Sequence, residues 1–309
     1  MGFGASHSRE CHPGFAGTSV KRHLSATSAA EDLAVSPAVV AHRGASADRA
    51  EHTLAAYTLA VEQGADALEC DVRLTKDRHL VCIHDRSVDR TSSGRGLVSE
   101  LTLAQLSALD YGSGQPSAAP SAPADRSGGR PAASATGLLR FEELLDLVVT
   151  APRPIRLFVE TKHPVRFGGL VERALLHTLA RHGLTRPASK DDSPVVMMSF
   201  SSRAVRRVRA QAPALPTVLL FDRLSRSTRD GTLPPWADYT GPGIHLLRSD
   251  PDYVRRAEAQ GNPTYCWTVD EPADIELCDR LGVRFLATNR PAATRSALRP
   301  ASSTTVPHA

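Results

Sequence analysis

The sequence predicts an α/β protein and, within that class, a TIM (β/α)8 barrel. About eight short apolar runs alternate with helical patterns over roughly 260 residues, which fits the repeat and size of that barrel. The apolar runs lack strict polar alternation, as expected for parallel strands that are buried on both faces. No G-x-G-x-x-G motif follows the first run, which disfavours an open dinucleotide-binding sheet.

The expected strands are short runs rich in apolar and β-branched residues. In chain order they are residues 38–42, 67–72, 80–84, 155–160, 195–200, 217–221, 243–246, 264–269 and 283–287, of which 243–246 is the weakest. The expected helices have apolar residues three or four apart, at residues 53–63, 102–109, 141–149, 170–182, 202–211, 252–260 and 273–281. Gly64, Gly183 and Gly261 follow three of these helices as natural C-terminal caps.

The barrel is predicted to occupy residues 37–295. Residues 1–36 are rich in serine, alanine, glycine and histidine, which predicts a disordered N-terminal extension. Residues 112–137 are rich in proline, alanine and serine with little to bury, which predicts a disordered low-complexity loop inserted within the barrel. Residues 296–309 are polar and are expected to form a flexible tail.

Composition and charge restrict the class of protein. The 309 residues are 41% hydrophobic and carry a formal net charge of +4 without a lysine/arginine run, so nucleic acid is not implied as a partner. The five cysteines form no C-x-x-C pair, which favours buried thiols in a reducing compartment. We find no apolar stretch approaching ~18 residues and no signal-like N-terminus, so we predict a cytoplasmic protein without a transmembrane segment.

Carboxylates end two of the expected strands. Glu69 and Asp71 lie two residues apart, so both point to one face of their strand. Glu160 ends a later strand, and the carboxyl ends of barrel strands meet at one rim. Three oxygen donors without nearby cysteines suit a hard divalent cation, Mg²⁺ or Ca²⁺. The alternative is that these acids are ion-pair partners of the rim arginine and lysine.

Two histidines also end expected strands. His42 and His84 would supply a general base and a general acid near neutral pH. Asp85 either orients the His84 imidazole or is a solvated loop residue. Arg43 and Lys162 bring fixed positive charge beside the carboxylates. A cation, two histidines and two basic side chains together predict a site for phosphoryl chemistry.

Several of these motifs together resemble the glycerophosphodiester phosphodiesterase family, over about residues 38–292. The segments that carry the resemblance are Ala41-His42-Arg43-Gly44-Ala45, Glu51-His52-Thr53, Glu69-Cys70-Asp71-Val72, His84-Asp85, Asp89-Arg90-Thr91, Phe158-Val159-Glu160-Thr161-Lys162, Ser199-Phe200 and Trp267-Thr268-Val269-Asp270. Three positions depart from the family pattern. His52 and Asp270 each stand where the family usually has asparagine, and Asn289 stands where it usually has aspartate.

The resemblance implies a TIM-barrel enzyme that hydrolyses glycerophosphodiesters to sn-glycerol 3-phosphate and an alcohol. By residue matching, it implies a divalent cation held by Glu69, Asp71 and Glu160, and an acid/base pair formed by His42 and His84. It also implies phosphate contacts from Arg43 and Lys162, a glycerol-pocket wall from Trp267, and an acid near the metal at Glu51.

Two alternatives remain open on the sequence. One is a lysophospholipase D or phospholipase-type lipid phosphodiesterase on the same barrel, with a lysophospholipid as substrate. The other is a non-catalytic barrel that binds a phosphate ligand. We hypothesise that His42 is the base and His84 the acid, and the sequence leaves the reverse order open.

Overall fold

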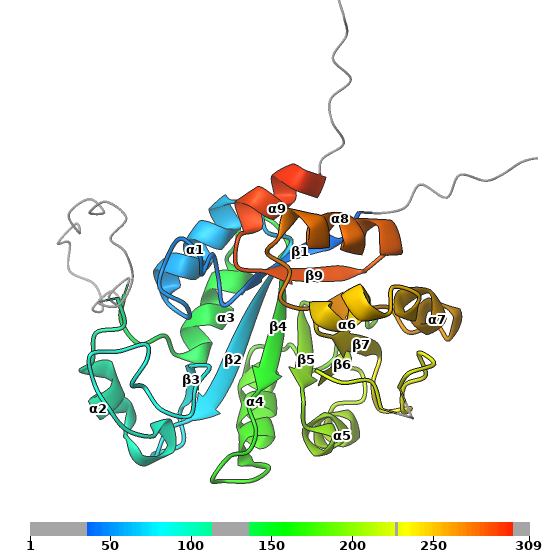
Figure 1. Cartoon of the computed structure of the whole chain (residues 1–309). Coiled ribbons are helices and arrows are strands. Elements are labelled where there is room, and N and C mark those ends of the chain that lie inside the picture. Colours follow the sequence, from blue (N-terminus) through cyan, green and yellow to red (C-terminus); the bar gives the residue numbers. More distant parts are fainter. Residues whose placement is uncertain (1–35, 113–135, 226–227, 299–309) are drawn as a thin grey trace, which may run out of the picture. The chain divides into compact units, whose positions relative to one another are not determined.

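The computed structural model describes residues 36–112, 136–225 and 228–298 (Figure 1). These residues belong to one compact unit. The disordered extension, the disordered inserted loop and the flexible tail predicted above lie almost entirely outside the described residues. At the C-terminal end, helix α9 (Pro291–Leu298) continues past the predicted barrel limit at residue 295.

Eight parallel strands form the barrel, so the predicted fold class is confirmed. They are β1 (Ala38–His42), β2 (Ala67–Leu74), β4 (Arg156–Thr161), β5 (Val195–Ser199), β6 (Thr217–Phe221), β7 (Tyr239–Pro242), β8 (Tyr265–Cys266) and β9 (Phe285–Thr288). Their order is β7-β6-β5-β4-β2-β1-β9-β8. The seam between β7 and β8 is joined by two parallel bridges, Thr240 to Thr264 and Gly243 to Trp267.

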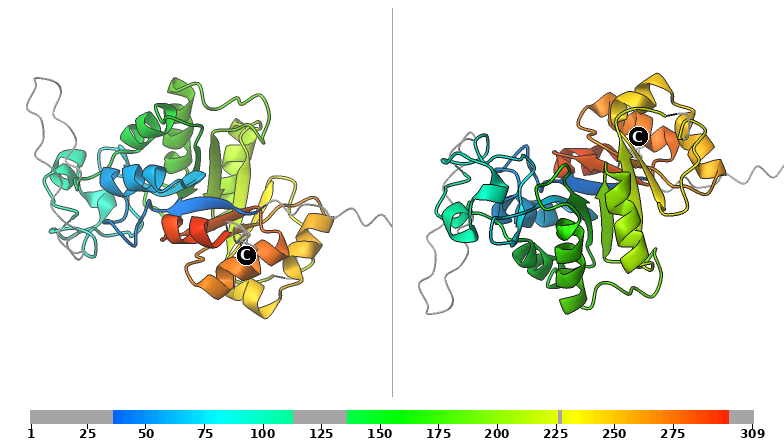
Figure 2. Two further views of the ribbon diagram at one scale, coloured as in Figure 1. Left: turned by 90° about the horizontal axis from the view of Figure 1, so that it is seen from above. Right: turned by 90° about the horizontal axis from the view of Figure 1, so that it is seen from below.

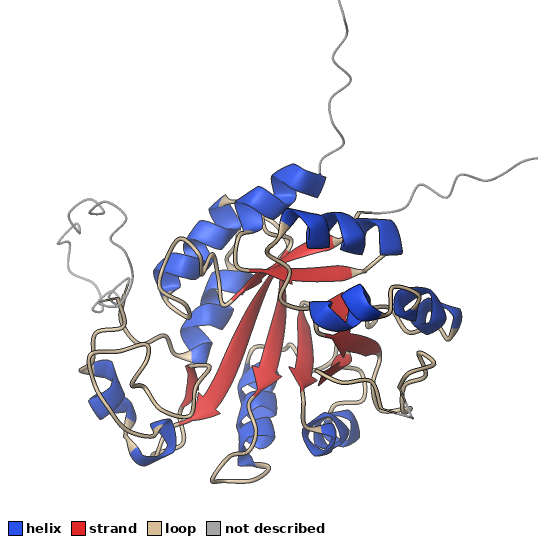
Figure 3. Ribbon diagram, in the orientation of Figure 1, coloured by secondary structure: helices blue, strands red, loops and turns tan. Residues whose placement is uncertain are grey.

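Helices form the outer layer around these strands (Figures 2 and 3). Besides α9, they are α1 (Leu54–Glu62), α3 (Phe141–Val149), α4 (Leu170–Arg181), α5 (Ser202–Gln211), α6 (Ile244–Ser249), α7 (Tyr253–Ala259) and α8 (Pro272–Leu281). Two short helices, η1 (Val98–Glu100) and α2 (Leu103–Ser107), lie in the excursion between β3 (Leu80–Cys82) and α3. Within the described ranges, no helix is long and apolar enough to cross a membrane.

Two predicted barrel strands are wrong. Residues 80–84 were expected to form a barrel strand, but β3 pairs antiparallel with β2, Val72 opposite Cys82, and lies off the barrel. Only residues 75–79 separate the two strands, too few for the crossover that a parallel pair needs. Residues 243–246 were also expected to be a strand, but they begin α6, and the barrel strand is β7 just before them.

The two faces of strand β2 pack against different layers, one against the outer helices and the other against the barrel interior. Its residues Leu68, Cys70 and Val72 belong to the apolar core shared with the helices. Inside the barrel, a second apolar core is centred on the buried ring of Phe158, which packs against Tyr265 and Phe285 at centroid distances of 4.9 and 5.0 Å. Glu69 and Asp71 share the inner face of β2, so the carboxylates face the barrel interior.

Candidate active site

Three buried carboxylates gather at the carboxyl ends of β2 and β4. The ligand atoms of Glu69, Asp71 and Glu160 all lie within 4.8 Å of one another. The cluster forms because Asp71 is in register with Glu160 across the parallel pair, while Glu69 lies two residues earlier on the same face. The structure therefore brings together the three acids that the sequence predicts as metal ligands.

Basic groups offset part of this negative charge. Lys162 Nζ lies 3.3 Å from Asp71 Oδ1 and 2.9 Å from Glu160 Oε1, and Arg43 Nε lies 3.3 Å from Asp71 Oδ2. Burial raises the pKa of Glu160 to about 8 and that of Glu69 well above its usual range. Burial also acts to raise the pKa of Asp71, but Lys162 and the hydrogen bond from His52 lower it well below its usual range. The cluster thus holds one firmly ionised acid beside two that favour a proton when no cation is bound.

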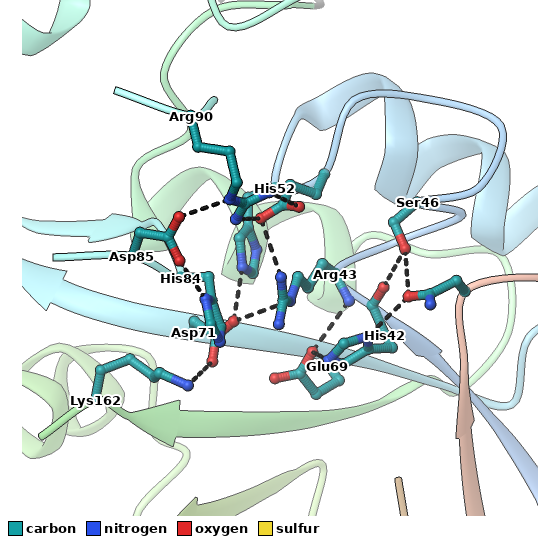
Figure 4. A network of polar contacts seen from close by, with 12 residues as sticks. His42, Arg43, Ser46, His52, Glu69, Asp71, His84, Asp85, Arg90 and Lys162 are labelled. Carbon is teal, nitrogen blue, oxygen red and sulfur yellow. Dashed lines mark hydrogen bonds and ion pairs between the residues drawn. The ribbon is translucent and has the colours of Figure 1, made fainter. Parts of the chain in front are cut away.

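The turn after β1 positions Arg43. Arg43 adopts φ +59° and Gly44 φ +83°, and the Arg43 backbone N–H donates to Glu69 Oε2 at 3.0 Å. A Cβ on Gly44 would lie 2.7 Å from the backbone carbon of Ala56, so only glycine fits this approach to α1. The turn directs the Arg43 guanidinium toward Asp71 (Figure 4). The same guanidinium also lies 3.2 Å from Glu51 Oε1.

His42 is the last residue of β1. Its Nδ1 lies 2.8 Å from Asn289 Oδ1, and its Nε2 lies 4.0 Å from Glu69 Oε2. Burial, reinforced by the nearby Arg43 charge, lowers the pKa of His42 from 6.5 to about 4. The ring is therefore neutral near pH 7 in the cation-free protein.

His84 reaches the site from the loop after β3, not from a barrel strand. Its Nδ1 lies 2.6 Å from Asp85 Oδ1, and its backbone oxygen accepts two hydrogen bonds from the Arg73 guanidinium, at 3.0 and 2.7 Å. Burial lowers the pKa of His84, although the bond to Asp85 acts in the opposite direction. Asp85 is thus placed against the imidazole, as one of the two sequence interpretations expected.

Arg90 connects Asp85, the partner of His84, to Glu51, the partner of Arg43. Sequence reasoning missed this link. It donates to Asp85 Oδ2 at 2.6 Å and to both oxygens of Glu51 at 2.8 Å. Glu51 also accepts from Arg43 at 3.2 Å. Burial acts to raise the pKa of Glu51, but the bonds from Arg90 and the Arg43 charge lower it to about 2. The D-R-T segment that carries Arg90 was the only sequence signal for this role.

His52, one of the departures from the family pattern, lies inside the site. It is buried, and its ring nitrogens lie 2.9 Å from Asp71 Oδ2 and 2.8 Å from the Tyr57 hydroxyl. Tyr57 in turn donates to the backbone oxygen of Glu69 at 2.9 Å. His52 therefore ties a carboxylate of the cluster to α1, and Tyr57 is a supporting residue that sequence reasoning missed.

These groups open into a cavity of about 140 Å³. Its lining includes the ionisable side chains of His42, Arg43, Glu69, His84, Glu160 and Lys162. Its lining also includes the apolar or aromatic side chains of Met198, Phe200, Leu220, Tyr265 and Trp267. The Trp267 ring N–H donates to the Gly241 backbone oxygen at 2.9 Å, and its ring contacts Phe200 edge-on at 5.1 Å. Ser199, another polar strand end, instead donates to the Thr161 backbone oxygen and is buried.

Comparison with known proteins agrees with this arrangement. Residues 42–293 match the glycerophosphoryl diester phosphodiesterase family. The chain is 51% identical over 270 residues, 87% of its length and 95% of the relative's, to a probable glycerophosphodiester phosphodiesterase 1 of Mycobacterium tuberculosis. It is 33% identical over 254 residues to a glycerophosphodiester phosphodiesterase of Bacillus subtilis, covering 82% of this chain and 83% of that one.

Solved structures share the fold. A putative glycerophosphoryl diester phosphodiesterase from Silicibacter pomeroyi superposes with a TM-score of 0.69 at 24% identity, covering 85% of this chain and 93% of that one. A phosphodiesterase from Oleispira antarctica, solved with its product sn-glycerol-3-phosphate, gives 0.67 at 22% identity and covers 85% and 96%. Since the family match spans most of the barrel and the relatives align along nearly their whole length, the chain belongs to the glycerophosphoryl diester phosphodiesterase family.

Proposed function

We propose that the protein hydrolyses water-soluble glycerophosphodiesters to sn-glycerol 3-phosphate and an alcohol. The observation that carries this proposal is the convergence of two histidines, three buried carboxylates and two basic side chains on one cavity. A phosphodiester needs its charge neutralised, its nucleophile deprotonated and its leaving oxygen protonated. The groups around the cavity match each of these needs.

The carboxylate cluster fits a divalent cation. Glu69, Asp71 and Glu160 would hold Mg²⁺ or Ca²⁺, because hard cations prefer carboxylate oxygens. The two raised pKa values support this assignment, since a bound cation would replace the protons that burial favours. When bound, the cation would stabilise negative charge on a phosphate oxygen.

The two histidines have different partners, which supports different roles. His42, neutral and held by an amide, would remove the proton from the nucleophile. His84, held by the Asp85 carboxylate, would donate a proton to the leaving alcohol, since a carboxylate stabilises the imidazolium form. Glu51 and Asp85 act through their neighbours, keeping Arg43 and His84 in place.

The remaining groups would orient the substrate. Arg43 and Lys162 carry positive charge at the cavity wall and would hold the phosphate. Trp267, which also lines the cavity, would pack against the carbon skeleton of the glycerol half. The lining thus offers charged groups for the phosphate and apolar or aromatic groups for the carbon skeleton of a glycerophosphodiester.

A chelation assay tests the proposal. Purified protein is incubated with glycerophosphocholine, and sn-glycerol 3-phosphate is measured with Mg²⁺ or Ca²⁺, with a chelator, and after the cation is restored. We expect release that the chelator abolishes and either cation restores. A lysophospholipid as the better substrate would favour the lipid phosphodiesterase alternative, and binding without release would favour the non-catalytic one.

We further propose that the protein works in a reducing compartment, the cytoplasm. The support is that Cys70, Cys82, Cys266 and Cys278 are buried as free thiols. Thiol counting on denatured protein that was alkylated at harvest tests this. Disulfides in place of these thiols would contradict it.

A further inference from the structure

A chain of hydrogen bonds runs from His42 away from the cavity. His42 Nδ1 lies 2.8 Å from Asn289 Oδ1, and Asn289 Nδ2 donates to Asp270 Oδ2 at 2.6 Å. The Asn289 backbone N–H donates to Asp270 Oδ1 at 2.7 Å, and the Thr288 hydroxyl donates to the same oxygen at 2.9 Å. The two departures from the family pattern near this rim therefore contact each other directly.

Asp270 determines which way the Asn289 amide points. An ionised carboxylate only accepts hydrogen bonds, so the NH₂ group of Asn289 must face Asp270 and its oxygen must face His42. A flipped amide would place its oxygen against a carboxylate oxygen at hydrogen-bond distance, which is repulsive. The Ser46 hydroxyl lies 2.8 Å from Asn289 Oδ1 and 2.7 Å from the His42 backbone oxygen; its one hydrogen cannot be donated fully to both, so Asp270 is the group that determines the orientation of the amide.

The fixed amide determines the tautomer of His42. Since Asn289 Oδ1 is an acceptor, His42 Nδ1 must carry the hydrogen. In a neutral ring this leaves Nε2 without a hydrogen, and Nε2 is the atom that lies 4.0 Å from Glu69 Oε2 beside the cavity. We propose that Asn289 is a positioning residue that fixes His42 in the tautomer with an unprotonated Nε2, and that Asp270 anchors the Asn289 amide.

The proposal deepens the proposed function, because a lone pair on His42 Nε2 is what a base at this position requires. It also explains how His42 can serve as the base although its Nδ1 contacts an amide and not a carboxylate. Asp270 supplies the negative charge, but the Asn289 amide separates that charge from the ring. His84 differs, since its Nδ1 contacts the Asp85 carboxylate directly.

The tautomer itself can be measured without any assay of activity. Two-dimensional ¹H–¹⁵N spectra of histidine rings in the ¹⁵N-labelled, cation-free protein distinguish the two neutral tautomers, and His42→Gln assigns the His42 signals by difference. We expect the pattern of a hydrogen on Nδ1 near pH 7.5. A hydrogen on Nε2 would overturn the proposal, even if the enzyme is active. The expected pattern in a protein that hydrolyses no glycerophosphodiester would leave this inference intact and refute only the proposed function.

Variants test the link to turnover. Asn289→Leu removes the acceptor and should lower kcat by about tenfold or more with little change in KM, because supporting partners of site histidines typically contribute that much. Asp270→Asn lets the amide turn and should give mixed tautomer signals with a smaller loss of kcat. Ser296→Ala is the control, since it removes an exposed hydroxyl on α9 that donates to the Ala292 backbone oxygen and to no residue of this chain of bonds. It should leave both kcat and the His42 signals unchanged.

A double variant keeps the test decisive if Asn289→Leu folds poorly. Asn289→Asp combined with Asp270→Asn exchanges the two side chains and keeps an acceptor on His42 Nδ1 and a donor behind it. We expect the double variant to restore the single tautomer and to exceed Asp270→Asn in kcat. A double variant no better than Asp270→Asn in either property would contradict the proposed roles.

Discussion

Individual charges at this site depend on partners that come from different parts of the chain. Lys162, just after β4, contacts the carboxylates of both Asp71 and Glu160. Glu51, in the loop before α1, accepts from Arg43 and from Arg90. Because every carboxylate of the buried cluster has a basic or imidazole neighbour, replacing one side chain changes the protonation of the others as well.

The raised pKa of Glu160 predicts how the cation-free protein responds to pH. An acid with a folded pKa near 8 and an unfolded pKa near 4.5 loses its contribution to stability as pH rises through 8. His42, lowered from 6.5 to about 4, has the opposite effect, but that effect is complete above pH 6.5. Tm in chelator should therefore fall between pH 6.5 and 8, while the gain in Tm on adding Mg²⁺ or Ca²⁺ should grow.

Glu160→Gln provides the comparison for this pH dependence. The variant removes one titrating group and one proposed ligand, so both the fall in Tm and the gain on adding cation should become smaller. Differential scanning fluorimetry across the pH range measures both quantities. A wild-type Tm gain that does not change from pH 6.5 to 8 would contradict the interpretation.

The proposed acid/base pair predicts a specific loss of turnover. His42→Ala and His84→Ala should each lower kcat by about two orders of magnitude, the usual contribution of a general acid or base. His177→Ala is the control, because His177 is exposed on α4 and does not line the cavity. Near-normal turnover in both active-site variants, with cation binding intact, would exclude the pair.

At the scale of elements, the close approach of the β1–α1 turn to α1 predicts the effect of Gly44→Ala. The new Cβ would lie 2.7 Å from backbone atoms of Ala56, so the turn that carries Arg43 must move. We expect a loss of stability above the about 1–2 kcal/mol of a left-handed alanine, together with a loss of activity. Gly183→Ala is matched, since Gly183 has φ +72° and nothing within 4 Å of its Cβ position.

Urea unfolding and the chelation assay compare the two glycine variants. Gly183→Ala should show only the cost of the left-handed backbone and keep full activity, because Gly183 follows α4 far along the chain from the β1–α1 turn. Equal losses of stability and activity in both variants would mean that the clash with Ala56 adds nothing to the cost of a left-handed alanine.

The sequence allowed most elements to be placed but not the direction of every strand. Apolar runs and helical spacing correctly placed β1, α3, α5 and β6, because burial patterns are local. Strand β3 was misplaced because a short apolar run looks the same in a hairpin as in a barrel. The strand of Tyr239–Pro242 was missed because Y-T-G-P lacks an apolar run and contains two poor strand formers.

For the site, the same local reasoning predicted that the three carboxylates lie together, but it did not predict the residues that hydrogen-bond to the site residues and hold them in place. Glu69, Asp71 and Glu160 could be brought together because two-residue spacing and strand ends determine where they point. The links through Arg90 and Tyr57 could not, because they depend on how a loop and a helix fold back over the barrel. The roles assigned to these residues remain predictions for the experiments above.

At the scale of the whole molecule, the barrel interior predicts which aromatic residues stabilise the fold. Phe158 is fully buried among Tyr265 and Phe285, whereas Phe200 is 44% exposed at the cavity rim. Phe158→Ala should lower the free energy of unfolding by about 3–5 kcal/mol. Phe200→Ala should change it by less than about 1 kcal/mol. Urea unfolding of both variants measures the difference, and similar losses would contradict the packing described.

The alternation of strand β2 limits which insertions and deletions the fold tolerates. Its alternate residues serve two layers, with Leu68, Cys70 and Val72 toward the helices and Glu69 and Asp71 toward the centre. Inserting or deleting one codon within this strand would exchange the two sets at once, placing charges in the apolar layer and leaving the centre without them. Such a chain would be removed as misfolded protein before it could persist as an inactive enzyme, so length variation is expected to be tolerated in the loops and not here.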